Sequence, residues 1–154
     1  MEKTVSALRQ QEILALQSQI SPHYISNMLD AINWIAIKKL GGPNEISYCA
    51  EKTAYLFRYG MNLSSSFDTL KNEIDIAKNT LDVLNIRYRT NIDLALNIPD
   101  ELLDLKVIKV LLQPFIENAV VHGFANYKSD GYISVTVKNV NDVITLTIAD
   151  NGRG

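Results

Sequence analysis

The chain has 154 residues, of which 47% are hydrophobic and 21% are charged, so it can form one globular domain or two small ones. The net charge of −2 comes without a basic block, which argues against a nucleic-acid partner, and the chain shows neither a signal sequence nor the roughly 20 consecutive apolar residues of a membrane span. The single cysteine, Cys49, excludes an internal disulfide framework, and its apolar neighbours favour a buried, reduced thiol in a cytoplasmic setting.

A long helix is predicted from about residue 5 to Leu40. Apolar side chains recur there every three or four residues and line up as one seam, which needs a partner surface. The seam consists of Ile13, Leu16, Ile20, Tyr24, Met28, Ala31 and Ile35. Pro22 interrupts the pattern, so the helix is expected to kink or divide there, with Ser21 capping the second piece.

A second helix is expected after the stop signal Gly41-Gly42-Pro43, with Asn44 as its cap and its end near Leu63. Two helices joined by so short a turn pack antiparallel. Because this hairpin alone leaves its seam open to water, we expect two copies of the chain to associate as a four-helix bundle.

The pattern changes after Ser64-Ser65-Ser66, which predicts a helical domain over residues 1–66 and a second domain over residues 67–154. Asp68 can cap a third helix there. The apolar face of this third helix contains Leu70, Ile74, Ala77, Leu81 and Leu84. Alternating apolar residues over 92–98 then predict a strand, and a helix from about Leu105 to His122 should follow.

Two further strands are predicted over residues 133–137 and 144–148. A turn at 139–142 joins them into an antiparallel hairpin. Strand, helix, strand and strand make an α/β sandwich, so the expected fold class is α+β, with a dimerising helical hairpin followed by this sandwich.

Glu117 and Asn118 lie side by side in an otherwise apolar run over residues 112–123. One interpretation is a polar site on this helix, because burying unpaired polar groups costs about 1–3 kcal/mol each. The other is an amphipathic helix whose two polar residues face solvent. An amide oxygen at Asn118 could ligate Mg²⁺ beside a triphosphate, since Mg²⁺ takes hard oxygen ligands and needs few from the protein.

The last predicted strand is followed directly by Asp150-Asn151-Gly152-Arg153-Gly154. An acceptor at a strand end with two glycines after it lets the backbone approach a ligand closely, although a plain Asp-Gly turn has the same sequence. Together with Asn118 on the preceding helix, this segment predicts the floor and rim of one nucleotide pocket.

His23 follows Pro22 and falls on the flank of the apolar seam, where solvent can reach it. A lone helical histidine can be structural, but its place beside a kink, in a chain with a candidate nucleotide site, favours a chemical role. His122 ends a predicted helix, where an imidazole can satisfy last-turn carbonyls, so the structural interpretation is preferred for it.

Three segments resemble motifs of the LytS/YesM-type sensor histidine kinases of bacterial two-component systems. Residues 16–27 (LQSQISPHYISN) resemble the phosphoacceptor region, residues 112–123 (LQPFIENAVVHG) the N-box, and residues 150–154 (DNGRG) the first glycine box. The resemblance covers nearly the whole chain and keeps the order and spacing of the family. It implies that the sandwich is the first part of a Bergerat-type (GHKL) ATP-binding domain.

The resemblance also implies roles for individual residues. His23 would be the phosphoacceptor, Asn118 a Mg²⁺ ligand and Asp150 the acceptor for the adenine amino group, with Gly152 and Gly154 shaping the ATP site. The γ-phosphoryl group of ATP would pass to His23 and then to an aspartate in the receiver domain of a response regulator. A homodimer is implied as well, in the cytoplasmic part of a membrane-anchored parent protein.

The sequence departs from the family pattern in three places. Val121 stands where lysine is common, Tyr24 follows His23 where many histidine kinases of other groups have an acid, and the chain stops at Gly154, before the family's ATP lid, second glycine box and later strands. We therefore expect the chain as given to bind ATP weakly or not at all and not to phosphorylate itself. Two other interpretations stay open: an ATP-hydrolysing or ATP-sensing module that phosphorylates no histidine, and a dimerisation scaffold.

Overall fold

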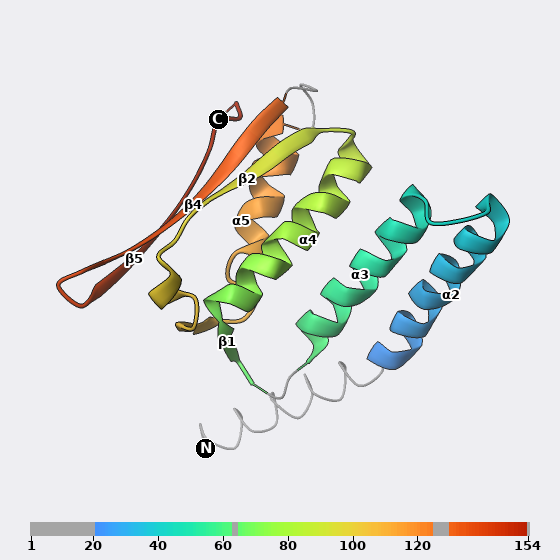
Figure 1. The fold of residues 1–154 in the computed structure, drawn as a ribbon, viewed down its shortest axis with the longest axis horizontal. Coiled ribbons are helices and arrows are strands. Elements are labelled where there is room, and N and C mark those ends of the chain that lie inside the picture. Colours follow the sequence, from blue (N-terminus) through green and yellow to red (C-terminus); the bar gives the residue numbers. More distant parts are fainter. Residues whose placement is uncertain (1–20, 63–64, 125–129, 154) are drawn as a thin grey trace, which may run out of the picture. The chain divides into compact units, whose positions relative to one another are not determined.

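The computed structural model describes residues 21–62, 65–124 and 130–153. The chain divides into two compact units, Met1–Met61 and Asn62–Gly154. The described part of the first unit contains helices, and the second unit combines helices and strands, so the fold class is α+β as predicted (Figure 1). Among the described helices, none is both long enough and apolar enough to cross a membrane.

The first unit begins with α2 (Pro22–Leu40). Ser21 stays extended and its Oγ accepts a hydrogen bond from the backbone N–H of Tyr24 at 3.3 Å, while proline at the first helical position gives up no helical bond. The helix ends at Gly41, whose φ of 77° lies in the left-handed region. The predicted cap and stop are therefore confirmed. The part of the predicted helix before Ser21 lies outside the described residues.

The second helix of this unit is α3 (Glu45–Met61), which follows the short turn after α2. Asn44 caps it as predicted, because its Oδ1 accepts from the Ser47 N–H at 3.0 Å and the Ser47 Oγ accepts from the Asn44 N–H at 2.9 Å. This reciprocal pair is a capping box. Cys49 on α3 is half-buried rather than fully buried.

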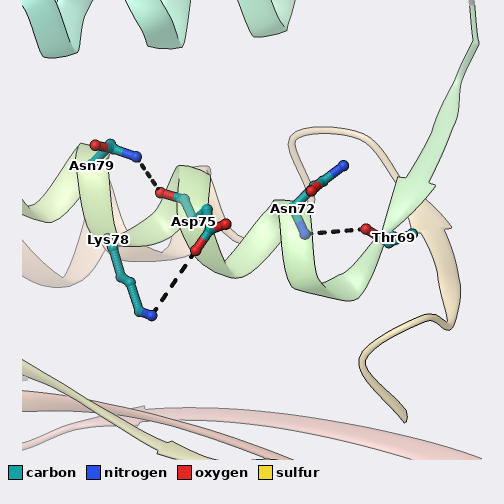
Figure 2. A network of polar contacts seen from close by, with 5 residues as sticks. All are labelled: Thr69, Asn72, Asp75, Lys78 and Asn79. Carbon is teal, nitrogen blue, oxygen red and sulfur yellow. Dashed lines mark hydrogen bonds and ion pairs between the residues drawn. The ribbon is translucent and has the colours of Figure 1, made fainter. Parts of the chain in front are cut away.

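The second unit begins with the short strand β1 (Phe67–Thr69), which leads into α4 (Leu70–Tyr88). The predicted cap at Asp68 is wrong by one residue. Thr69 is the cap, since its Oγ1 accepts from the backbone N–H of Asn72 at 3.2 Å (Figure 2). Asp68 instead accepts from the Asn72 side chain at 2.7 Å. The shift arises because β1 keeps the backbone extended through Thr69.

The main sheet has the strand order β2-β4-β5. Its strands are β2 (Asn91–Asn97), β4 (Asp130–Val140) and β5 (Val143–Asp150). β2 and β4 are parallel, whereas β4 and β5 form an antiparallel hairpin whose turn residues, Asn141 and Asp142, have φ angles of 52° and 62°. Two left-handed residues match the right-handed twist of the flanking strands. The three predicted strands and their hairpin are confirmed.

Helices α4 and α5 lie on the same face of this sheet (Figure 1). The core lies between these helices and the sheet. It consists of Leu70, Ile74, Ala77, Leu81, Leu84, Ile92, Leu102, Leu112, Ile116, Ala119, Val120, Phe124, Ile133, Val135 and Val137. Residues that alternate along β4, such as Ile133 and Val135, point into this core, while their neighbours point away from it. Burial of this apolar set on one face is what the alternating pattern predicted.

The helix predicted from Leu105 to His122 is wrong in its first half. Residues Asp100–Leu102 form a 3₁₀ turn, and β3 (Lys106–Ile108) pairs with β1 in a separate two-stranded ribbon. Only α5 (Gln113–Asn118) is α-helical, and it continues as a π-helical segment, Ala119–Phe124. The apolar residues before α5 satisfy their backbone groups through a strand partner far away in the sequence, which a local pattern cannot reveal.

Candidate functional site

Asn118 is the last α-helical residue of α5, and the helix widens immediately after it. The Ala119 N–H is shared between the carbonyls of Phe115 and Ile116. Buried Ile116 and Val120 fix one side of this segment in the core, so Asn118 and His122, one turn apart, are exposed on the other. Single π-helical turns of this kind are frequent at functional sites.

A close contact between two glycines brings the end of this helix to the segment after β5. The backbone N–H of Arg153 donates to the Gly123 carbonyl at 3.1 Å. A Cβ added to Gly123 would lie 3.3 Å from Asp150 Oδ1 and 3.4 Å from the Gly152 Cα. The two chain segments therefore meet backbone to backbone, which requires residues without side chains.

Asp150 ends β5, and the turn after it is held in place from two sides. The Asp150 Oδ1 accepts from the Gly152 N–H at 3.0 Å, closing a tight turn. Asn151 joins this turn to β4, since its Oδ1 accepts from the Tyr132 N–H at 2.7 Å and its own N–H donates to the Tyr132 carbonyl at 3.3 Å. The Asp150 carboxylate is consequently exposed on a fixed backbone.

Between these two segments lies a cavity of about 240 Å³, a little below the roughly 300–1,000 Å³ of typical small-molecule sites. Its lining residues are Phe115, Asn118, Ala119, His122, Gly123, Ile148, Asp150 and Arg153. Apolar side chains can hold a flat ring there, a carboxylate can accept from an amino group, and the imidazole and guanidinium can approach an anion. The cavity thus offers the groups that a nucleotide needs.

The structure brings two of the predicted site residues together, because Asn118 and Asp150 line the same cavity. Gly152 adjoins the cavity through its contact with Gly123, and Gly154 lies outside the described residues. Glu117, the neighbour of Asn118, accepts from the Gln113 side chain at 2.8 Å and is exposed, so the solvent-facing interpretation holds for Glu117.

The lining residues that sequence reasoning missed include Phe115, His122 and Arg153. For His122 the structural role was preferred, yet the structure places this side chain in the wall of the cavity. A usable signal was present, since His122 follows Asn118 by four residues and so falls on the same side of a helix. Within the described residues, no group of three His, Cys, Asp or Glu side chains could hold a metal ion by itself.

His23 lies in the first turn of α2, in the other unit, and is exposed. Its Nδ1 is 3.2 Å from the Nδ2 of Asn27, one turn further along the helix. The next turn is tied to α3, because Arg58 on α3 donates to Ser26 Oγ at 2.6 Å and lies 3.7 Å from Asp30. The helix around His23 is thus held while the imidazole itself reaches solvent.

The family described as "Histidine kinase" matches residues 11–92 of the chain. Sensor histidine kinase YesM of Bacillus subtilis (strain 168) is 29% identical over 147 residues, which cover 96% of this chain and 25% of YesM. Sensor histidine kinase/phosphatase LytS of Staphylococcus aureus (strain Mu50) is 30% identical over 149 residues, with 96% and 25% covered. The chain thus spans about a quarter of these relatives.

Among solved structures, the histidine kinase domain of the blue-light activated histidine kinase from Erythrobacter litoralis EL346 aligns with 86% of this chain and 72% of its own chain. The sequence identity is 15% and the TM-score is 0.45.

Proposed function

The chain belongs to the histidine kinase family and is of the LytS/YesM sensor type, and from this we propose that, together with the later segments of the family's ATP-binding domain, it transfers the γ-phosphoryl group of ATP to His23. The observation that supports this most is the meeting of Asn118 and Asp150 in one cavity. These residues come from segments far apart in the sequence, and a plain turn or an amphipathic helix gives no reason for them to share a cavity.

In this proposal the apolar residues of the cavity would hold the adenine ring, and the Asp150 carboxylate would accept a hydrogen bond from its amino group. Asn118 and His122 would hold the phosphates. The donor set fits Mg²⁺ only in the company of phosphates, because the described residues offer a carboxamide here and no cluster of three metal-binding side chains. When bound, Mg²⁺ would neutralise charge on the phosphates, with the Asn118 amide oxygen among its ligands.

The nitrogen of His23 that we propose to react is Nε2. Nδ1 is engaged with the Asn27 amide, which leaves Nε2 as the nitrogen that solvent and ATP can approach. A neutral ring attacks through the nitrogen without a proton, so attack by Nε2 requires the ring proton on Nδ1. In the structure the Asn27 Nδ2 faces Nδ1, and the amide must turn over to accept this proton through its Oδ1. Nε2 forms the bond to the γ-phosphorus, the bond to the bridging oxygen breaks, ADP leaves, and the imidazole loses a proton to solvent.

Two partners belong to this proposal. Phosphohistidine would pass its phosphoryl group to an aspartate in the receiver domain of a response regulator, in the cytoplasm. The second partner is another copy of the chain, since α2 exposes a row of apolar side chains: Tyr24, Met28, Ile32 and Ile35. These four residues are called the apolar face of α2 below.

Labelled ATP and Mg²⁺ test the phosphoacceptor, with a form of the protein extended by the later segments of the family's ATP-binding domain. His23→Ala should abolish acid-labile incorporation, while Lys38→Ala, at the far end of the same exposed helix, should leave it unchanged. Mapping the phosphopeptide then distinguishes His23 from His122, the other histidine of these 154 residues. Label that persists in His23→Ala would rule out the proposed acceptor, and release of free phosphate without labelled protein would favour ATP hydrolysis.

The nucleotide site is tested separately, in the same extended form of the protein, with a matched pair of variants on α5. Asn118→Ala should raise the Kd for Mg-ATP about tenfold or more, since a hydrogen bond to a charged group contributes roughly 1.5–3 kcal/mol. Glu117→Ala, at the neighbouring exposed position, should leave the Kd within about twofold, as surface substitutions usually do. Equal effects of the two substitutions would argue against Asn118 as a ligand.

A further inference from the structure

Glu73, in the first turn of α4, is a fully buried carboxylate, with 0% of its surface exposed. It accepts three consecutive backbone N–H groups. Oε1 accepts from Val110 at 2.7 Å, and Oε2 accepts from Leu111 at 2.6 Å and from Leu112 at 3.2 Å. Successive N–H groups that converge on one anion form a nest, and here the anion is part of the protein.

The convergence depends on an unusual backbone conformation at Val110, whose φ is 61°. A β-branched residue rarely adopts the left-handed region, and such a conformation persists only where the surroundings hold it. Glu73 stabilises this conformation of Val110, because its carboxylate accepts a hydrogen bond from the Val110 N–H. The loop before α5 is therefore fixed to α4 by a side chain.

The same loop starts the helix that carries Asn118. Leu112 is the residue before α5, it is fully buried, and its carbonyl accepts from the N–H groups of Phe115 at 3.1 Å and Ile116 at 3.2 Å. Asn118 follows within the next turn. A continuous series of hydrogen bonds thus runs from the Glu73 carboxylate to the helical turn that presents Asn118 to the cavity.

We propose that Glu73 is a positioning residue for the nucleotide site: its carboxylate sets the place of α5 and hence of the Asn118 amide in the cavity. The part that concerns nucleotide rests on the proposed function. A buried charge is a poor way to gain stability alone, because apolar residues of similar size usually do as well or better. A buried carboxylate is well suited to fix the orientation of the loop before α5, because the three N–H groups of this loop can all reach the carboxylate in only one arrangement.

The test compares Glu73→Gln with Asp75→Asn, a matched loss of charge on the same helix. The Asp75 side chain is 47% exposed and lies 4.0 Å from Lys78 (Figure 2). In NMR spectra of the nucleotide-free protein, Glu73→Gln should move the Asn118 side-chain amide and Ala119 backbone signals, and Asp75→Asn should leave both in place. This readout needs no ATP, so it decides on Glu73 even if the proposed function fails.

Addition of Mg-ADP to the protein extended by the later segments of the ATP-binding domain then measures the consequence for the site. The Kd should rise about tenfold in Glu73→Gln and stay unchanged in Asp75→Asn, because a displaced Asn118 amide loses the charge-assisted contact with Mg-ADP that the proposed function gives it. A purely structural role predicts a lower melting temperature with unchanged Asn118 signals and Kd in the folded variant, and that result would overturn the proposal.

Glu73→Asp serves where Glu73→Gln does not fold, since it keeps the charge but shortens the side chain by one methylene group. The carboxylate then reaches the three N–H groups only if the loop and α5 move toward α4. The Asn118 signals should shift again, and a spectrum identical to that of the unmodified protein would contradict the role assigned to Glu73.

Discussion

Gly152 lies so close to Gly123 that a methyl group at position 152 would stand 2.7 Å from the Gly123 Cα and 2.9 Å from its carbonyl carbon and oxygen. The obstacle is backbone, which cannot rotate away as the end of a side chain can. The contact also contains the hydrogen bond from Arg153 to Gly123, so a shift there would separate the Asp150 turn from the helix that carries Asn118.

Gly152→Ala should therefore destabilise the second unit by about 1–3 kcal/mol, the usual effect of overpacking. Urea unfolding followed by circular dichroism measures the loss. Gly60→Ala is the control, because nothing lies within 4 Å of a Cβ added at this position in α3, and alanine favours a helix over glycine by up to about 1 kcal/mol. The two substitutions should act in opposite directions. If Gly152→Ala left the free energy of unfolding unchanged, the contact between the two segments would be looser than in the structure.

Asn85 shows how one side chain can join two elements. Its Nδ2 donates to the Ile92 carbonyl at 3.0 Å, and its Oδ1 accepts from the Ile92 N–H at 3.1 Å and from Thr90 Oγ1 at 2.9 Å. The amide thus closes the turn between α4 and β2 at a residue whose side chain is buried in the core. Both backbone groups of Ile92 depend on it.

We expect Asn85→Ala to lower the free energy of unfolding by about 2 kcal/mol, since a buried backbone group without a partner costs roughly 1–3 kcal/mol. Asn72→Ala on the same helix removes an exposed side-chain contact with Asp68 and should change stability by less than about 0.5 kcal/mol. Chemical unfolding of both variants gives the comparison. If the Asn85→Ala and Asn72→Ala variants were equally stable, water would have replaced the Asn85 amide as the hydrogen-bond partner of Ile92.

Regular elements were predictable from the sequence where the signal is local. The cap at Ser21, the stop at Gly41 and the hairpin of β4 and β5 each follow from a few neighbouring residues, and the structure confirms them. For the run before α5 the prediction of a helix from Leu105 is wrong. Its real partners are β1 and the Glu73 carboxylate, which lie far away in the sequence.

The candidate site was predictable to a similar extent. Asn118 and Asp150 could be chosen because a carboxamide in an apolar run and a carboxylate before glycines are visible as residue types. The contribution of Arg153 and Phe115 to the cavity depends on how α5 meets β5, and the backbone contact of Gly123 with Gly152 fixes that. No spacing in the sequence encodes this contact.

On the scale of the whole molecule, the first unit exposes much apolar surface. Tyr24, Met28 and Ile35 on the apolar face of α2 are 62%, 45% and 52% exposed. An apolar groove of about 320 Å³ lies between the C-terminal half of α2 and the start of α3, and its lining residues are Ile32, Ile35, Ala36, Lys39, Leu40 and Ile46. Exposed apolar patches of this extent are typical of association surfaces. A second hairpin of the same kind would fill the groove and complete a four-helix bundle.

We therefore expect the protein to be a dimer in light scattering at micromolar concentration, and Met28→Asp to weaken it. An unpaired charge placed in a closed apolar seam costs about 3 kcal/mol or more, which corresponds to a rise in the dissociation constant of roughly 100-fold. Lys38→Glu changes the charge of α2 more than Met28→Asp does. Because Lys38 lies outside the apolar face of α2, this substitution should leave association nearly unchanged. A monomeric unmodified protein would contradict the bundle. If instead both variants dissociated equally, the association would be electrostatic and the apolar face of α2 would not be its surface.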